Sequence, residues 1–152
     1  MLISLRRIDR ADVVRGGHII VKAYAEPPWE ENWTIENATS RLDELATTPG
    51  YLAVAAYDAD DLVGFAFAVP HTSAIGRGLQ LAEIAILPQH QRTGIGTRLL
   101  RHIEHEALSL GYAQIWLVSQ RAGAVADYYT ANEYSPSCKL CVYSKRLGDH
   151  AL

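Results

Sequence analysis

At the centre of this chain stands the segment Ile84-Ala85-Ile86-Leu87-Pro88-Gln89-His90-Gln91-Arg92-Thr93-Gly94-Ile95-Gly96-Thr97-Arg98-Leu99-Leu100. An apolar run ends at a proline, a short basic turn follows, and apolar residues then recur at helical spacing after two glycines. The pattern predicts a strand, a loop and a helix N-terminus. The N-terminus of a helix presents backbone N–H groups and a positive end, which favour an anion, most often a phosphate.

Two common phosphate-binding motifs are excluded by this segment. The dinucleotide fingerprint needs a third glycine where Leu99 stands, and a P-loop needs Gly-Lys-Ser/Thr where Thr97 follows Gly96. What remains is Gln91-x-x-Gly94-x-Gly96, which resembles the acetyl-CoA signature Arg/Gln-x-x-Gly-x-Gly/Ala of the GCN5-related N-acetyltransferases (GNAT superfamily). The alternative is a glycine turn before an ordinary helix.

Composition places the chain among ordinary globular proteins. It has 152 residues, 49% of them hydrophobic, and a net charge of −3, which disfavours a general nucleic-acid binder. No apolar run reaches membrane-span length and the N-terminus lacks a secretory segment, so we expect one cytoplasmic domain over residues 1–152. Cys138 and Cys141 have no second ligand pair for zinc, so we expect two reduced thiols and no metal.

Hydrophobic periodicity and turn residues give the expected elements. Strands are expected at residues 2–8, 51–57, 62–69, 79–87 and 115–118, with a last strand or strand pair at 137–146. Helices are expected at 9–25, capped by Asp9 and kinked or split at Gly16-Gly17, between Thr34 and Pro49-Gly50, at 94–110 and at 124–131. Residues 70–78 are expected to form a loop, and Asn132 to take a left-handed cap position.

This order mixes hairpins with crossovers and predicts an α/β (α+β) fold, a mixed sheet with helices on both faces. The GNAT fold, whose sheet is mostly antiparallel, has the same order, so the resemblance covers nearly the whole chain.

The resemblance implies acetyl-CoA as the co-substrate. The pyrophosphate would be held by backbone N–H groups of Arg92 to Thr97, with charge added by Arg92, and the pantetheine arm would pair with the strand edge before them. The cofactor-binding residues are then Ile84, Ala85, Ile86, Gln91, Arg92, Thr93, Gly94, Ile95, Gly96 and Thr97. One N–H group of this edge could also donate to the thioester oxygen.

Glu83 is the only carboxylate on this strand and the candidate general base. Several GNAT enzymes keep a carboxylate at this point; others place it two or four residues before the edge, where Ala82 and Gln80 stand. Strand alternation puts Glu83 on the opposite face from both, unless a bulge re-aims it. A structural acid paired with Arg77 or Arg92 is the alternative, and water alone as the base stays open.

Tyr129 is the candidate acid. The segment from Ala126 to Tyr134 resembles a GNAT segment whose second aromatic, a tyrosine, protonates the leaving thiolate. An ordinary tyrosine hydroxyl has a pKa of about 10, so it is protonated at neutral pH and close enough in pKa to a thiol to donate its proton to the leaving thiolate. The alternative is a packed aromatic. Glu133 replaces the family glycine, so Asn132 is expected to carry any left-handed residue. Ala122 replaces a frequent asparagine, for which Ser119 or Arg121 can substitute.

The acceptor is expected at the segment 24–33. Its aromatic and acidic side chains suit a cationic amine through cation–π and charge contacts: Trp29, Glu30, Glu31 and Trp33. The alternative is a proline-stiffened loop with tryptophans on the core.

We therefore expect an N-acetyltransferase that acts by direct transfer on a small-molecule amine of the amino-sugar antibiotic or polyamine type. A protein or peptide N-acetyltransferase and a non-catalytic acyl-CoA sensor are the alternatives. The resemblance alone implies a homodimer.

Overall fold

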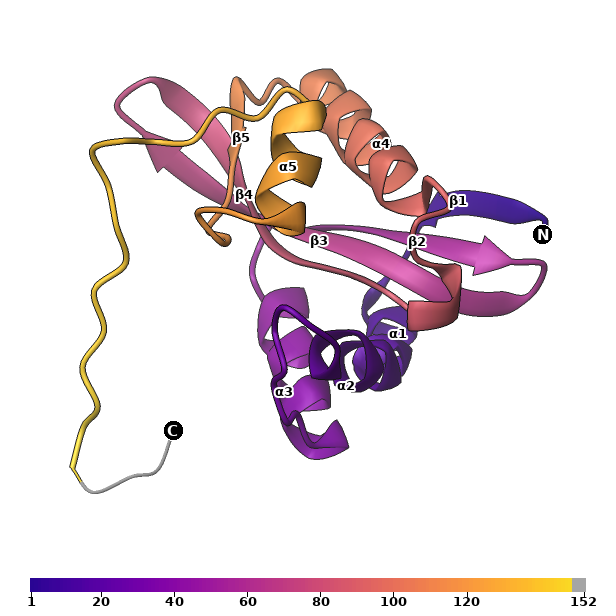
Figure 1. Ribbon diagram of the computed structural model, residues 1–152. Helices are drawn as coiled ribbons and strands as arrows, with labels where there is room; N and C mark the ends of the chain where they lie inside the picture. The colour runs from indigo at the N-terminus through magenta and orange to yellow at the C-terminus, as the bar shows by residue number, and fades with distance from the viewer. Residues whose placement is uncertain (149–152) are drawn as a thin grey trace. The chain divides into compact units, whose positions relative to one another are not determined.

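A five-stranded sheet in the order β1-β2-β3-β4-β5 organises the first 118 residues (Figure 1). The computed structural model describes residues 1–148, and they divide into two units, Met1–Val118 and the part from Ser119 onward. The strands are β1 (Ile3–Arg7), β2 (Leu52–Asp58), β3 (Asp61–Ser73), β4 (Gly76–Ile86) and β5 (Gln114–Trp116). The first four strands pair antiparallel and β5 pairs parallel with β4, which confirms the predicted mixed, mostly antiparallel sheet.

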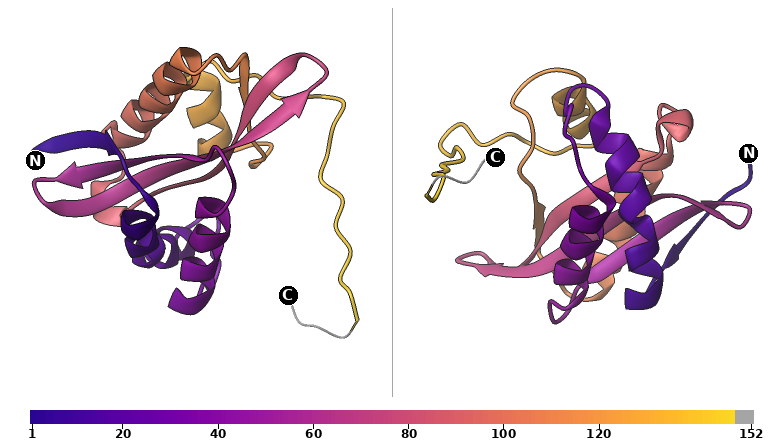
Figure 2. Two further views of the ribbon diagram at one scale, coloured as in Figure 1. Left: turned by 180° about the vertical axis from the view of Figure 1, so that it is seen from behind. Right: turned by 90° about the horizontal axis from the view of Figure 1, so that it is seen from below.

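Helices of the first unit cover both faces of this sheet (Figures 1 and 2). On one face lie α1 (Arg10–Val13), the 3-10 segment η1 (Val14–Gly16), α2 (Gly17–Ala25) and α3 (Ile35–Ala46), and on the other lies α4 (Ile95–Ser109). The helix α4 turns an apolar stripe to the sheet, and burial of each Leu or Ile contributes about 1.5–3 kcal/mol. Its buried residues are Ile95, Leu99, Leu100, Ile103 and Ala107.

Local signals set the helix boundaries as expected. Asp9 accepts a hydrogen bond from the Asp12 N–H at 3.2 Å, and Thr34 accepts one from the Asn37 N–H at 3.0 Å. The first helix is split at Gly16 by the 3-10 segment. A Cβ on Gly16 would lie 3.1 Å from the Phe65 ring, so a side chain there would push the helix away from the sheet.

The prediction of a loop at residues 70–78 is wrong. β3 and β4 continue through it as a long hairpin, in which His71 pairs with Gly78 and Thr72 with Arg77. Gly76, at φ 121°, begins the returning strand. Backbone ladder hydrogen bonds do not require apolar side chains, so this polar, exposed extension carries no periodic signal.

A β-bulge interrupts β4 just before its C-terminal end. Glu83 lies opposite Phe67 and Leu81 lies opposite Ala68, so Ala82 is an extra residue without a partner in the ladder. Gln80 lies opposite Val69, two residues from Phe67. Glu83 and Gln80 therefore share a face of the sheet, although regular alternation would put them on opposite faces.

The second unit holds the helix α5 (Ala124–Ala131) and an extended segment after it (Figure 1). The strand expected at 137–146 is wrong: residues 135–148 form neither helix nor strand and are exposed. An apolar run becomes a strand only where a partner accepts its backbone hydrogen bonds.

Cys138 and Cys141 are free thiols, as predicted. Within the described chain no helix is long and apolar enough to cross a membrane.

The cap of α5 also differs from the expectation. Asn132 has φ −95°, and the left-handed residue is Glu133, at φ 70°. The buried Asn132 donates from its side-chain amide to the Tyr128 carbonyl at 2.8 Å, while the backbone N–H of Tyr134 bonds the Tyr129 carbonyl at 3.0 Å. The Asn132 side chain therefore forms a hydrogen bond within the cap, and the next residue, Glu133, takes the left-handed conformation.

Candidate active site

The C-terminal half of β4 is an open strand edge. β5 pairs only with Gly78–Gln80, so among residues 1–148 no strand lies against the following part of β4 on that side. The Leu87 N–H bonds the Val63 carbonyl at 2.8 Å, and because an antiparallel ladder alternates, Ala85 turns its backbone to β3 while Ile84 and Ile86 turn theirs to the open edge. Two of the three expected edge residues therefore present backbone groups there.

Side chains lie against the two carbonyls on this edge. The Tyr24 hydroxyl oxygen lies 3.1 Å from the Ile84 carbonyl oxygen, within hydrogen-bond distance, and Gln91 Nε2 donates to the Ile86 carbonyl at 2.9 Å. The signature glutamine thus connects the strand edge to the loop that follows it. A cofactor arm lying along this edge would meet backbone groups whose orientation is fixed by neighbouring residues.

The loop before α4 forms a cradle at the helix N-terminus. Arg92 (φ 60°) and Gly94 (φ 85°) are both left-handed, and the Thr93 hydroxyl donates to the His90 carbonyl at 2.6 Å. Gly94 is the N-cap, no side chain caps the helix there, and its first turn holds no acidic residue. A Cβ on Gly94 would meet no atom within 4 Å. An uncapped, positive helix end facing open space fits a diphosphate.

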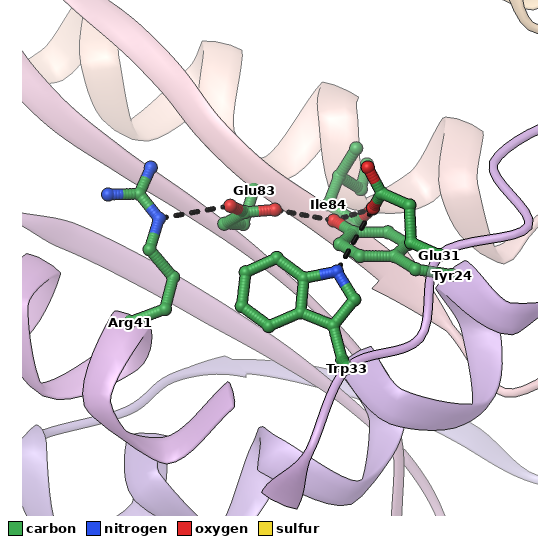
Figure 3. Close-up of polar contacts among 6 residues, drawn as sticks. All are labelled: Tyr24, Glu31, Trp33, Arg41, Glu83 and Ile84. Atoms are coloured by element: carbon green, nitrogen blue, oxygen red, sulfur yellow. Dashed lines mark hydrogen bonds and ion pairs between the residues drawn. The ribbon is translucent and has the colours of Figure 1, made fainter. Parts of the chain in front are cut away.

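Glu83 points to the face covered by α2 and α3 (Figure 3). Its Oε2 accepts from the Tyr24 hydroxyl at 2.6 Å, its Oε1 accepts from Arg41 Nε at 3.1 Å, and its side chain is 13% exposed. The expected structural partners were Arg77 and Arg92. Arg77 instead donates to the Leu110 carbonyl at 3.3 Å and lies over the Tyr112 ring.

The chemistry open to Glu83 follows from its remaining lone pairs. A carboxylate offers about four acceptor positions, and the two hydrogen bonds occupy one on each oxygen. The others can accept from an amine or a water molecule. The bulge at Ala82 decides that this carboxylate faces the helices that carry the aromatic segment, which is the exception that the sequence analysis left open.

Two tryptophan rings lie near the tyrosine that bonds this carboxylate. The Trp29 and Trp33 rings lie 6.1 Å and 6.3 Å from the Tyr24 ring. Trp33 Nε1 donates to Glu31 Oε1 at 3.0 Å (Figure 3). Glu30 is exposed at a left-handed turn (φ 48°). The structure therefore brings Trp29, Glu31 and Trp33 into one group with Tyr24, whose hydroxyl bonds Glu83.

The sequence did not predict a role for two residues of this group. Tyr24 lies in the acceptor segment but had no role of its own, and Arg41 lies on the next helix, where nothing in its spacing marks it. The only available signal was the position of Arg41 one residue before the buried Leu42, on a helix that packs against the sheet.

Tyr129 lies on α5 between two other tyrosines. Its ring centroid is 4.9 Å from that of Tyr128 and 5.9 Å from that of Tyr134.

The histidines of α4 give no sign of a metal site, since His102 pairs with Glu106 at 3.6 Å. Among the residues that the structure describes, no group of three or more His, Cys, Asp or Glu side chains could hold a metal ion.

A family model described as the acetyltransferase (GNAT) family matches residues 19–131. The ribosomal protein bS18-alanine N-acetyltransferase of Escherichia coli is 29% identical over 124 residues, which cover 81% of this chain and 74% of that protein.

Solved structures share the fold at low identity. An aminoglycoside acetyltransferase from an uncultured soil metagenomic sample, in complex with sisomicin, superposes with a TM-score of 0.77 at 13% identity and 97% coverage of both chains. The ribosomal-protein-alanine N-acetyltransferase of Brucella melitensis superposes with a TM-score of 0.70 at 16% identity, covering 95% of this chain and 99% of that one. Aminoglycoside N-acetyltransferase AAC(6')-Iy in complex with CoA has a TM-score of 0.72 at 13% identity and 95% coverage of both.

Proposed function

Because this chain belongs to the acetyltransferase (GNAT) family, we propose that it transfers the acetyl group of acetyl-CoA directly to a primary amine of a small cationic molecule, of the amino-sugar or polyamine type. The observation that carries the proposal is the position of Glu83. The Tyr24 hydroxyl bonds this carboxylate and lies 3.1 Å from the Ile84 carbonyl oxygen on the open edge of β4, and the Tyr24 ring lies 6.1 Å and 6.3 Å from the Trp29 and Trp33 rings.

Holding the co-substrate falls to backbone groups. The amides of the cradle before α4, from Arg92 to Thr97, bind the diphosphate, and the edge at Ile84 and Ile86 pairs with the pantetheine arm. Acetyl-CoA supplies an activated acyl group on sulfur. No cysteine occurs in residues 1–118, which supports direct transfer to the amine rather than an acyl-enzyme.

Proton transfer is assigned to two side chains. Glu83 accepts a proton from the amine, directly or through a water molecule, so that the nitrogen lone pair becomes nucleophilic. Tyr129 donates a proton to the leaving thiolate, a role that rests on the resemblance of its segment to the family's. Trp29 and Trp33 offer ring faces and Glu31 a negative charge to a second cationic group on the acceptor.

A protein or peptide N-terminus is the second candidate acceptor. The relative that acts on ribosomal-protein alanine favours it, since 29% identity extends over 81% of this chain. Such an acceptor offers a single α-amine followed by a peptide backbone, whereas the acidic and aromatic side chains around Glu83 suit several cationic groups. The two candidates therefore separate by the charge of the acceptor.

The experiment is thiol release from acetyl-CoA over a panel of polyamines, aminoglycosides and short peptides. Turnover on polycations supports the proposal, turnover on peptides alone supports the second candidate, and tight CoA binding without turnover indicates an acyl-CoA sensor. Gly94→Asp should abolish CoA binding in calorimetry, because a carboxylate would stand beside the diphosphate.

Gly76→Asp is the matched control for this variant. Gly76 is also left-handed, and a Cβ there also meets no atom within 4 Å, but it begins β4 in the β3–β4 hairpin, beside Arg77, which bonds the carbonyl at the C-terminal end of α4 rather than its N-terminus. The control should bind CoA like the unaltered chain. An unchanged CoA affinity in Gly94→Asp would contradict the cradle.

A further inference from the structure

Tyr24 presents one proton to two acceptors. Its hydroxyl lies 2.6 Å from Glu83 Oε2 and 3.1 Å from the Ile84 carbonyl oxygen (Figure 3). A phenol carries a single O–H hydrogen and two lone pairs. With Glu83 ionised, the shorter distance to a charged acceptor assigns that hydrogen to the carboxylate. The Ile84 carbonyl then stands in reserve as a second place for it.

Arg41 decides which oxygen of Glu83 can take up a proton. Arg41 Nε donates to Oε1, and a guanidinium cannot accept a hydrogen bond. A proton on Oε1 would face another donor. A proton on Oε2 would face the Tyr24 oxygen, which has lone pairs to accept it.

We propose that Tyr24 is a positioning residue that gives both protonation states of Glu83 a complete set of hydrogen bonds. This inference rests on the proposed function. When Glu83 Oε2 accepts a proton from the amine, its new O–H donates to the Tyr24 oxygen, and the Tyr24 hydrogen rotates to the Ile84 carbonyl. One N–H bond breaks and one O–H bond forms; Tyr24 neither gains nor loses a proton.

The arrangement differs from that of a purely structural ion pair. A structural pair needs donors to the carboxylate alone, and Arg41 with any second donor would supply them. A base that is half-buried must also be satisfied after it has become a neutral acid, because an unpartnered buried hydroxyl is costly. The Ile84 carbonyl lies on the open edge of β4, where the proposed function places the co-substrate. The hydrogen that rotates therefore belongs to a hydroxyl, that of Tyr24, which lies between the base Glu83 and this edge.

The kinetic test uses Tyr24→Phe, which keeps the ring near Trp29 and Trp33 and removes the hydroxyl. We expect kcat to fall about tenfold or more while KM for the amine stays within about twofold, as for loss of a hydrogen bond that matters in the reacting state. The pH profile of kcat should shift as well, which a merely structural role would not cause. Tyr112→Phe, which removes a hydroxyl from a ring packed under Arg77, should change neither.

The structural test needs no substrate. Glu83→Gln places an amide where the protonated acid would be, with its oxygen accepting from Arg41 and its NH₂ donating to the Tyr24 oxygen. In a crystal structure of this variant, the distance from the Tyr24 oxygen to the Ile84 carbonyl should shorten below 3.1 Å.

The outcomes separate the two proposals. A wild-type chain without turnover on any amine contradicts the proposed function. The Glu83→Gln structure still tests whether the Tyr24 hydroxyl turns to the Ile84 carbonyl. Turnover in the wild type with an unchanged kcat and pH profile in Tyr24→Phe overturns the inference alone. A Glu83→Gln structure in which the Tyr24 oxygen lies 3.1 Å or more from the Ile84 carbonyl oxygen does the same.

Discussion

Arg41 and Glu83 form an ion pair whose two members differ in exposure. The Arg41 side chain is 34% exposed and that of Glu83 only 13%. Arg41→Gln would leave a half-buried carboxylate with a neutral neighbour. We expect this variant to lose about 1–3 kcal/mol of unfolding free energy, and amine turnover with it, because a buried charge without its partner is costly. Denaturant unfolding and thiol-release rates measure the two effects.

A matched control for this arginine lies nearby on the surface. Arg10 also pairs with an acid on α3, Asp43, at 2.7 Å, but both side chains are about half exposed (58% and 45%). Arg10→Gln should cost less than about 1 kcal/mol, as exposed pairs do. Equal losses in the two variants would show that the burial of Glu83 has no energetic consequence.

Tyr129 allows a second test on a single side chain. Tyr129→Phe keeps the ring that packs against Tyr128 and Tyr134 and removes the proton that the proposed mechanism gives to the thiolate. Turnover should fall about 100-fold with little change in KM for acetyl-CoA. Tyr128→Phe, one position earlier on α5, is the comparison. A wild-type rate in Tyr129→Phe would return this tyrosine to a packing role.

Among the elements, the β2–β3 hairpin is tied to the segment before α4 by Asp58. Its carboxylate accepts from the Leu2 N–H at 3.0 Å and pairs with His90 Nε2 at 3.2 Å. The Leu2 N–H and then the His90 side chain hold the pKa of Asp58 below its ordinary value of 3.8. A depressed folded-state pKa stabilises the fold above the ordinary value, and that stability is lost as pH falls through the lowered one.

Asp58→Asn should therefore melt below the wild type at neutral pH, and the difference should shrink as pH falls below 3.8. Thermal unfolding followed over this range measures it. Asp60→Asn, in the same turn and exposed, should show no such convergence. A gap between Asp58→Asn and the wild type that is constant with pH would mean that the charge of Asp58 does not contribute.

The elements that sequence reasoning located correctly are those with local signals. Asp9 and Thr34 cap their helices, and the stripe of α4 repeats every three or four residues, because capping and helical burial depend on neighbours within one or two turns. The polar end of the β3–β4 hairpin and the absent strand at 137–146 depend on whether a partner strand is available. That information lies far away in the sequence.

Over the whole molecule, the residues of the candidate site come from segments that are distant in the chain. The Ile84–Thr97 region was identified from its own sequence, since a strand end, a glycine turn and a helix start are adjacent. Tyr24, Arg41 and Glu83 come from three elements, α2, α3 and β4, and meet only when both helices pack on one face of the sheet. No local pattern could reveal this meeting.

The amino-acid sequence alone determined the family, the strand–turn–helix junction at Gly94 and the starts of the helices capped by Asp9 and Thr34, because each depends on backbone geometry encoded by adjacent residues. Tertiary structure alone decided where Glu83 points and which groups contact it. The extra residue Ala82 re-aims the strand, and this irregularity appears only in the pairing with β3. Side-chain hydrogen bonds then join elements separated by 42 and 59 residues, a separation that packing spans and sequence periodicity does not.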